Sequence, residues 1–260
     1  MKELFQAEVV ANQLIGGEVY DLYLRAPKEV EKARAGQFLS VFTGNPSMIL
    51  PRPLSICELD KIGGVFRIVY RAGGDGTKEI AKAVAGDYLG VLGPLGTAFK
   101  VNKAHKNFAI VGGGIGVPPL LELSKRIRHE VPGSKISVFL GFRSKYQVIL
   151  EADFKKYVDH IHITTDDGTY GTKGNNIAVL PPQGGFDIAY GCGPLIMLKF
   201  LAKYAEDKDI PCVVSTEEHM ACSVGACMAC VIKVKKGNDW AYVRVCCTGP
   251  VFDAKELIWE

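Results

Sequence analysis

The chain has 260 residues, 48% of them hydrophobic and 23% charged, which is an ordinary composition for a globular protein of one large domain or two to three small ones. Its formal net charge of +3 is too weak to argue for a nucleic-acid or membrane partner. No apolar run approaches the roughly 20 residues that a membrane helix needs, and the first residues alternate like a strand, unlike a signal peptide. We therefore expect a cytoplasmic protein, whose thiols stay reduced.

Residues 1–100 carry the pattern of an all-β region with many turns. Six short segments are rich in Val, Ile, Leu, Tyr and Phe and are separated by Gly and Pro: 7–15, 19–26, 37–44, 53–59, 65–72 and 88–93. This spacing is typical of a barrel or a sandwich.

Two stretches of this part are candidate binding sites. Arg52-Pro53-Leu54-Ser55 sets a guanidinium and a hydroxyl beside a proline, which cannot occupy a central strand because it lacks an N–H group. Residues 70–77 join a strand end to a glycine-rich turn and a helix start, which together favour an anion. We expect that helix at 76–84, with Thr77 as its N-cap. Either stretch alone is more often an ordinary turn with a solvated arginine.

From residue 107 onward, strands alternate with helices, which predicts a parallel sheet covered by helices. The expected strands are 107–114, 135–144, 159–168, 186–194 and 211–216, and the expected helices are 117–130 and 195–207. Leu120, Leu121, Leu123 and Ile127 lie on or near one face of the first helix and are expected in the core. Residues 231–236 and 240–245 should form a small β pair. We expect three parts, 1–100, 101–212 and 213–260, that pack together.

A glycine run joins the first of these strands to its helix and is a candidate nucleotide site. Gly112, Gly113, Gly114 and Gly116 would let a pyrophosphate approach the backbone at a helix N-terminus. The strict G-x-G-x-x-G fingerprint fails at Val117, and no acidic residue ends the next strand to hold a ribose hydroxyl. A tight structural turn is therefore an alternative.

A second strand-to-helix junction, Gly191-Cys192-Gly193-Pro194, lies at the end of the strands where ligands of open α/β sheets bind. Cys192 is thus a candidate to touch a bound ring. The alternative for this residue is a small buried hydrophobe, which is the usual role of a free cysteine.

Five of the chain's 8 cysteines lie between residues 215 and 252. Cys222, Cys227 and Cys230 have the spacing C-x4-C-x2-C, and Cys246 and Cys247 follow after a short polar stretch. This order is typical of a plant-type [2Fe–2S] site, in which a tight loop supplies three thiolates and a distant segment supplies the fourth. Gly225 and its small neighbours would let backbone N–H groups approach the cluster sulfurs.

Other kinds of cysteine site fit the spacing less well. Structural zinc usually takes two C-x2-4-C pairs, disulfides need an oxidising compartment, and a Rieske site needs two histidines where only His219 is near. The residues leave the fourth ligand open, because adjacent side chains such as those of Cys246 and Cys247 point in different directions.

The order of motifs along the chain resembles the ferredoxin-NADP reductase superfamily. The matching motifs are RPLSI at 52–56, the glycine-rich helix start that ends in Gly76-Thr77, GPLG at 93–96, GGGIGVPP at 112–119 and GCGP at 191–194. The cysteine pattern C-x4-C-x2-C-x15-C and the ending CCTGPVF at 246–252 narrow the resemblance to electron-transfer subunits of NAD-dependent dihydroorotate dehydrogenase B. This resemblance extends from end to end. It implies a flavin-binding β-barrel, a nicotinamide-binding α/β domain and a small C-terminal [2Fe–2S] domain.

The resemblance also implies roles for single residues. FAD would be bound by Arg52, Pro53, Leu54, Ser55, Val69, Tyr70, Arg71, Gly76 and Thr77, with Arg52 toward the pyrophosphate and Ser55 near the isoalloxazine. The pyridine nucleotide would be bound by Gly112, Gly113, Gly114 and Gly116, with Cys192 near the nicotinamide. The cluster ligands would be Cys222, Cys227, Cys230 and Cys246, with Cys247 as a bystander. Ser223 and Ala229 stand where the family pattern leads us to expect glycines.

The implied function is electron transfer. Electrons would pass from the FMN of a catalytic partner subunit, which oxidises dihydroorotate for pyrimidine synthesis, through the cluster and FAD to NAD+. The implied assembly is a heterotetramer of two such chains with two partners. Related subunits that serve a sulfite reductase or a bifurcating NADH/NADPH-ferredoxin transhydrogenase are alternatives. So is a non-enzymatic metal-binding protein on this fold.

Overall fold

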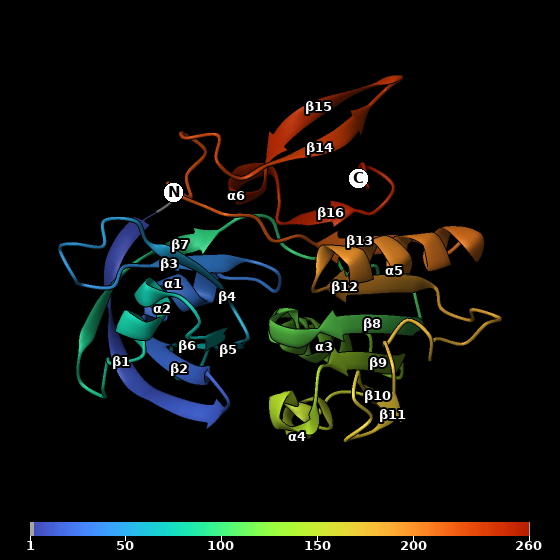
Figure 1. Ribbon diagram of the computed structural model, residues 1–260, viewed down its shortest axis with the longest axis horizontal. Coiled ribbons are helices and arrows are strands. Elements are labelled where there is room, and N and C mark those ends of the chain that lie inside the picture. Colours follow the sequence, from blue (N-terminus) through green and yellow to red (C-terminus); the bar gives the residue numbers. More distant parts are fainter. Residues whose placement is uncertain (1–2, 260) are drawn as a thin grey trace.

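The computed structural model describes residues 3–259, so the first two of the N-terminal residues that were expected to alternate like a strand lie outside the described residues. Two seven-stranded sheets and a separate two-stranded hairpin are arranged side by side (Figure 1). The first sheet is formed by the N-terminal part of the chain, and the second by the middle of the chain together with a short strand close to the C-terminus. The predicted fold class is confirmed.

The first sheet is antiparallel and curls into a half-barrel. In spatial order its strands are β4 (Arg52–Ser55), β3 (Phe38–Val41), β7 (Tyr88–Leu95), β1 (Glu3–Gly16), β2 (Val19–Arg25), β6 (Val65–Arg71) and β5 (Glu58–Asp60). Its helices are α1 (Pro27–Lys32) and α2 (Asp75–Ile80). Because β4 and β5 are consecutive in the chain yet form opposite ends of the sheet, the short link between them closes the curl.

Two sequence predictions in this sheet were wrong in detail. The segment 53–59 is two strands, because the consecutive residues Ile56 and Cys57 are both fully buried and so break the alternation of one continuous strand. The short helix begins at Asp75 with Gly74 as its N-cap, so Thr77 is not the cap. The Thr77 hydroxyl reaches back instead, accepting a hydrogen bond from the Gly74 N–H at 3.1 Å and donating one to the Gly74 carbonyl at 2.9 Å.

The second sheet is parallel except at one edge. Its spatial order is β11 (Thr172–Lys173), β10 (His160–Thr165), β9 (Lys135–Phe142), β8 (Asn107–Gly113), β12 (Ile188–Cys192), β13 (Cys212–Ser215) and β16 (Val251–Asp253). The helices that follow its strands are α3 (Pro119–Glu130), α4 (Glu151–Phe154) and α5 (Leu195–Asp207). The strands and helices expected from 107 to 216 are confirmed, while β11, β16 and α4 were not predicted.

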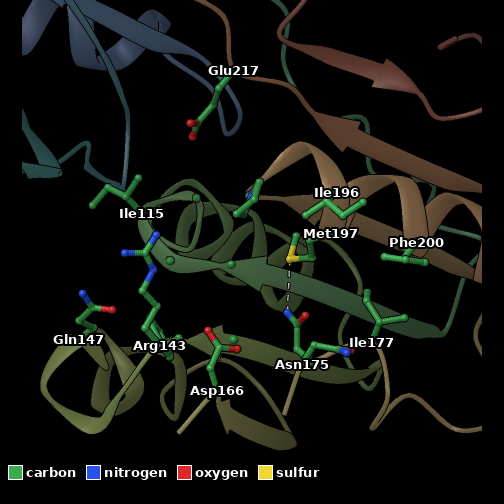
Figure 2. A pocket seen from close by; sticks show the side chains of 18 of the residues that line it. Ile115, Arg143, Gln147, Asp166, Asn175, Ile177, Ile196, Met197, Phe200 and Glu217 are labelled. Carbon is green, nitrogen blue, oxygen red and sulfur yellow. Dashed lines mark hydrogen bonds between the residues drawn. The ribbon is translucent and has the colours of Figure 1, made fainter. Parts of the chain in front are cut away.

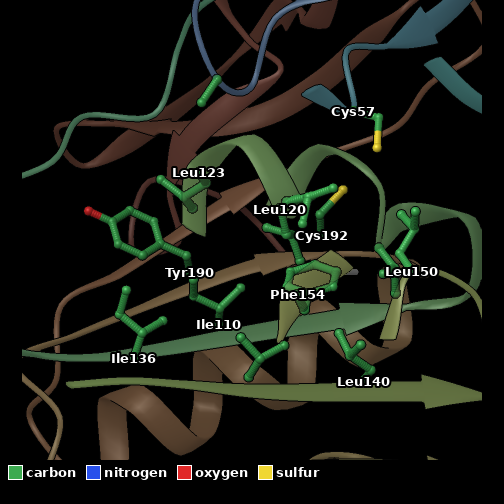
Figure 3. Packing of buried hydrophobic residues seen from close by; sticks show 14 of the residues in the cluster. Cys57, Ile110, Leu120, Leu123, Ile136, Leu140, Leu150, Phe154, Tyr190 and Cys192 are labelled. Carbon is green, nitrogen blue, oxygen red and sulfur yellow. The ribbon is translucent and has the colours of Figure 1, made fainter. Parts of the chain in front are cut away.

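Alternate residues of the central strand β8 serve two different core clusters. Phe108 and Ile110 belong to the cluster that contains the α3 leucines, and Ala109 and Val111 belong to the cluster that contains the buried side of α5. Figure 3 shows the first cluster, in which Leu120 and Leu123 of α3 pack above the sheet. The four residues predicted on the buried face of α3 are all completely inaccessible. Both faces of the sheet are thus covered by helices, as buried parallel sheets require.

The predicted hairpin is confirmed as β14 (Val231–Lys236) and β15 (Asp239–Arg244), followed by the short helix α6 (Val245–Thr248). The chain then returns to the parallel sheet, where β16 pairs antiparallel with β13. Within the described part of the chain, no helix is long and apolar enough to cross a membrane.

A buried group of charges joins the half-barrel to the parallel-sheet region, and we call it the interdomain charge cluster. Arg67 of β6 lies at its centre and contacts Asp21 at 2.8 Å, Glu58 at 3.4 Å and Asp153 of α4 at 3.2 Å. Lys125 of α3 also contacts Glu58, at 3.2 Å. Because these side chains come from β2, β5, β6, α3 and α4, the cluster sets how the two regions face each other.

Candidate redox site

The cysteine loop between β13 and β14 bends sharply, and its sulfurs accept backbone hydrogen bonds. Three of its residues have positive φ: Ser223 at 57°, Gly225 at 90° and Met228 at 60°. The Cys222 sulfur accepts hydrogen bonds from the N–H groups of Ala226 at 3.2 Å and Cys227 at 3.4 Å. Desolvation raises the pKa of Cys222, but the backbone donors outweigh it and lower the pKa to about 6. The loop thus favours a thiolate, which is the form that binds iron.

Four of the five sulfurs of this segment form two pairs. Cys222 and Cys227 lie within hydrogen-bonding reach of each other, and so do Cys230 and Cys246. The Cys246 N–H also donates to the Cys230 sulfur at 3.4 Å. Two pairs of thiolates, supplied with N–H donors, fit a [2Fe–2S] cluster with two ligands to each iron.

The neighbour Cys247 is close to the same loop. Its sulfur lies 3.7 Å from that of Cys246 and would collide with a side chain added at Gly225. Gly225 is therefore required both by its positive φ and by this close approach. Among the residues that the structure describes, no three His, Cys, Asp or Glu side chains surround one point as the ligands of a single metal ion would.

A cavity of about 240 Å³ lies between β4, β6 and the segment after β13. Six of the predicted flavin residues line it: Pro53, Leu54, Ser55, Val69, Tyr70 and Arg71. The segment Ser215–Glu218, together with Met220, forms the opposite wall and leads directly into the cysteine loop. This segment carries no recognisable motif, although a strand followed by two glutamates, Glu217 and Glu218, at the ligand side of an α/β sheet is a usable signal.

The other predicted flavin residues gather at the start of α2. The Arg52 guanidinium lies so close to Gly76 that any side chain there would overlap it, and it also donates to the Leu50 carbonyl. Thr77 sits in the same first turn. A guanidinium beside a helix start is suited to a phosphate group.

A second cavity, of about 410 Å³, opens at the carboxyl ends of β8, β9 and β10 (Figure 2). Gly113, Gly114 and Gly116 line it, as predicted for a nucleotide. Four charged residues also line the cavity: Arg71, Arg143, Asp166 and Glu217. Arg143 and Asp166 lie at the ends of neighbouring strands. No acidic residue ends β9, where one was sought in the sequence. Asp166 follows β10 instead, one strand farther along the sheet, and was therefore not predicted.

Two of the predicted nucleotide residues do not line this cavity. Gly112 is buried within β8, where a side chain would meet Val117 and Leu120 of the core. Cys192 is 1% exposed and packs in the core cluster beside Leu120 (Figure 3). Burial raises the pKa of Cys192 well above its ordinary value. The next residue, Gly193, does line the cavity.

Glu217 lines both cavities and also a third one, of about 480 Å³, between α5 and the β14–β15 hairpin. Figure 2 shows its carboxylate entering the second cavity from the side opposite Asp166. The Glu217 side chain is exposed to the space of the cavities, but the cavity walls keep much of the surrounding water away. This desolvation of the carboxylate raises the pKa of Glu217. Glu217 is therefore the carboxylate at the junction of the three spaces.

The sequence and the fold match known proteins over nearly the whole chain. Residues 217–258 match the family model described as the iron-sulfur cluster binding domain of dihydroorotate dehydrogenase B. The electron transfer subunit of dihydroorotate dehydrogenase B (NAD(+)) from Clostridium perfringens is 38% identical over 98% of this chain and 98% of its own length. The Geobacillus kaustophilus subunit of the same name is 40% identical over 96% of both chains.

Among solved structures, the fold superimposes on a chain of the NADH-dependent reduced ferredoxin-NADP oxidoreductase, which is described in connection with flavin-based electron bifurcation. The TM-score is 0.85 and the sequence identity is 30%, and the match covers 97% of this chain and 90% of that chain. The ferredoxin reductase of carbazole 1,9a-dioxygenase shares the fold at 19% identity, with a TM-score of 0.66 and coverage of 81% of this chain and 67% of that chain. The cysteine loop, the two adjoining cavities and these near-complete matches together place the chain in the family of electron transfer subunits of dihydroorotate dehydrogenase B (NAD(+)).

Proposed function

We propose that this chain carries electrons from a catalytic dihydroorotate dehydrogenase subunit to NAD+ through a [2Fe–2S] cluster and FAD, in pyrimidine biosynthesis. One observation supports this route above the others. The cavity lined by the predicted flavin residues shares Arg71 and Ile115 with the nucleotide cavity, and its wall at Ser215–Met220 continues into Cys222. A flavin there would lie between the nucleotide and the cluster.

The need for an intermediate cofactor follows from the chemistry of the two ends. A nicotinamide exchanges electrons in pairs and an iron–sulfur cluster takes them singly, and FAD supplies both kinds of transfer when it is bound. The residues of this chain bind and orient the cofactors and exclude water between them. We assign no general base to this chain, because oxidation of dihydroorotate belongs to the partner.

We propose the following roles for single residues. FAD is held by the predicted lining residues from 53 to 71, with Arg52, Gly76 and Thr77 at its phosphates. The pyridine nucleotide is held by the glycine turn 113–116, with Cys192 buried behind the nicotinamide. The cluster ligands are Cys222, Cys227, Cys230 and Cys246. The corresponding functional parts are residues 1–100, 101–212 and 213–260.

The relatives' name implies a catalytic partner subunit. We propose that this partner contains FMN, that two copies of each chain form a heterotetramer, and that the complex works in the cytoplasm. A direct test is to purify this chain alone under anaerobic conditions and to measure its iron, sulfide and flavin. It should reduce artificial acceptors with NADH but not turn over dihydroorotate. Turnover of dihydroorotate by the isolated chain would contradict the division of labour.

A second candidate is a subunit of a bifurcating NADH-dependent ferredoxin-NADP oxidoreductase. The TM-score of 0.85 to a chain of such an enzyme favours it. Affinity purification from the native cell separates the two, because the main proposal expects a co-purifying FMN protein that oxidises dihydroorotate. Recovery of a ferredoxin-reducing partner would select the second candidate.

Flavin affinity should depend strongly on the absence of a side chain at Gly76. Gly76→Ala would push the Arg52 guanidinium away from the first turn of α2. We expect the dissociation constant of FAD to rise about tenfold or more, as when a charge-assisted hydrogen bond is lost. Fluorescence titration of the flavin-free protein with FAD measures this. Gly73→Ala is the matched control, because the nearest atoms to a side chain there, on Arg71, lie at an ordinary contact distance of 3.6 Å.

The preference for NADH over NADPH should depend on Asp166 and Arg143, which share one cavity. A carboxylate repels the 2′-phosphate of NADPH, and a guanidinium attracts it. We expect Asp166→Asn to raise the ratio of kcat/KM for NADPH to that for NADH about tenfold, and Arg143→Ala to lower it. Steady-state assays with both nucleotides check this. A ratio that moves in the same direction in both variants would contradict the assignment.

The affinity for NAD+ should depend on pH through Glu217. Its pKa is raised by burial, so the carboxyl is protonated over a range where an exposed glutamate is ionised. Only the ionised form attracts the positive nicotinamide of NAD+, so the affinity should increase as pH rises through this pKa, by about tenfold. Calorimetric titration from acid to neutral pH should show this in the wild type and a flat profile in Glu217→Gln. NADH, which lacks the positive ring, should bind with little pH dependence in both.

A further inference from the structure

A buried hydrogen bond connects the cysteine loop to strand β3 of the half-barrel. The hydroxyl groups of Ser40 and Ser223 are 2.6 Å apart, although the residues are separated by 183 positions in sequence. Ser40 is completely buried and Ser223 is 1% exposed, so water does not compete for this bond. Ser223 directly follows the proposed iron ligand Cys222. The bond therefore begins one residue from the cluster site.

The other end of the bond lies on the face of the half-barrel that holds the flavin. Along β3, Leu39 and Val41 are in the barrel core, so Phe38 and Ser40 point to the opposite face. Phe38 lines the flavin cavity. Across the ladder, Phe38 pairs with Ser55 and Ser40 pairs with Pro53, and both of these partners also line the cavity. Ser40 does not line the cavity itself, but it is adjacent in the sheet to residues that do, through its pairing with Pro53 and its neighbours along β3.

The backbone conformation at Ser223 is one that a residue with a side chain seldom adopts. Its φ of 57° lies in the left-handed region, where a residue with a side chain is strained and glycine is favoured. The family pattern also leads us to expect glycine there. A serine at this position accepts backbone strain, and its only hydroxyl contact among the described residues is Ser40.

We infer that Ser40 and Ser223 are positioning residues that fix the cysteine loop against the flavin wall and so set the rate of electron transfer between flavin and cluster. The inference rests on the proposed function. Electron tunnelling weakens steeply with distance, so a loop that moves away from β3 transfers electrons more slowly. The serines do not touch the nucleotide cavity, so reduction of the flavin by NADH is not affected.

The test uses the full chain loaded with both cofactors and the variants Ser40→Ala, Ser223→Gly and the double variant. Ser124→Ala is the matched control, because it removes a buried hydroxyl that bonds the Leu120 carbonyl, away from the cysteine loop. A laser pulse in the presence of a sacrificial donor reduces the flavin, and the bleaching of the cluster then gives the rate of electron transfer. Stopped-flow mixing with NADH gives the rate of flavin reduction separately.

We expect electron arrival at the cluster to slow by up to about fivefold in each single variant, because loss of one buried hydrogen bond shifts the equilibrium between the docked and undocked loop by about that factor. The double variant should be no slower than the singles, and flavin reduction by NADH should be unchanged. Hydrogen exchange of residues 221–229 should increase in Ser40→Ala, whose substitution lies far from the loop in sequence. Loaded variants that transfer electrons at the wild-type rate, or an equal slowing in Ser124→Ala, would overturn the inference.

Two further outcomes are informative. If a variant does not retain its iron, the hydrogen exchange of residues 221–229 is compared between the iron-free variant and the iron-free wild type. Equal exchange in Ser40→Ala and in the wild type overturns the inference. If the wild type itself lacks iron, sulfide or flavin, or is not reduced by NADH, the proposed function fails instead, which separates the two results.

Discussion

Replacing Cys246 with serine is expected to remove most of the [2Fe–2S] cluster, while replacing Cys247 with serine leaves it in place. Cys246 is 1% exposed, contacts the Cys230 thiol and donates its N–H to the Cys230 sulfur. Loss of this thiolate leaves one iron with a single cysteine ligand, and such clusters depend on four. Iron and acid-labile sulfide, measured after anaerobic purification, and the electron paramagnetic resonance spectrum of the reduced protein give the result.

The same measurement on two more variants makes this test decisive. Cys227→Ser should lose the cluster as Cys246→Ser does, because both would remove a ligand. Cys212→Ala should retain it, because Cys212 is a buried core residue of β13. A cluster that survives in Cys246→Ser and disappears in Cys247→Ser would reverse the assignment of the fourth ligand.

Replacing Arg67 with methionine should lower the free energy of unfolding by about 3–5 kcal/mol, the usual consequence of removing one partner from a buried ion pair. The Arg67 side chain is 13% exposed and is the shared partner of Asp21, Glu58 and Asp153. Desolvation lowers the pKa of Arg67, but hydrogen bonds from its guanidinium to Asp21 and Asp153 outweigh this and raise it above the ordinary value. Without the guanidinium, the nearly buried Asp21 would lose its ion-pair partner, while Glu58 and Asp153 would keep only Lys125 and Lys156.

Urea denaturation of the wild type and the variant measures this loss. Arg25→Met is the matched control, because Arg25 and its partner Glu8, 3.3 Å away, are both exposed, and such pairs contribute at most about 1 kcal/mol. A loss of less than about 1 kcal/mol in Arg67→Met would show that the carboxylates find other partners. Since the interdomain charge cluster joins β6 to α4, the variant should also reduce the flavin more slowly with NADH.

The parts of the fold that depend on local pattern were predictable from the sequence. The hydrophobic face of α3, the helix α5 and the strands of the parallel sheet follow from periodicity within short windows. The split between β4 and β5 and the strand β16 were not predicted, because they depend on partners far away in the chain. Val251–Asp253 has little to mark it as a strand until β13 offers it an edge.

The residues of the candidate site also fall into those that a local motif predicts and those that only the folded chain brings together. Residues that lie in contiguous motifs, such as Pro53–Ser55 and Gly113–Gly116, line the two cavities as expected. Asp166 and Glu217 were missed because each enters the site at the end of a different strand, and only the folded sheet brings those ends together. For Cys192, sequence alone left open whether it touches a ligand or is a buried hydrophobe, and the structure places it in the core.

The chain returns to the parallel sheet through β16, beside the strand from which the cysteine-containing segment departs. The Thr216 N–H donates to the Pro250 carbonyl at 3.0 Å, so the segment that carries all five clustered cysteines leaves and re-enters the sheet at one point. Such a segment is inserted as a closed unit, and its removal would leave both sheets continuous. The cysteine-containing part is therefore a unit attached at one edge of the parallel sheet, so changes within it can alter the metal site without re-pairing the strands of either sheet.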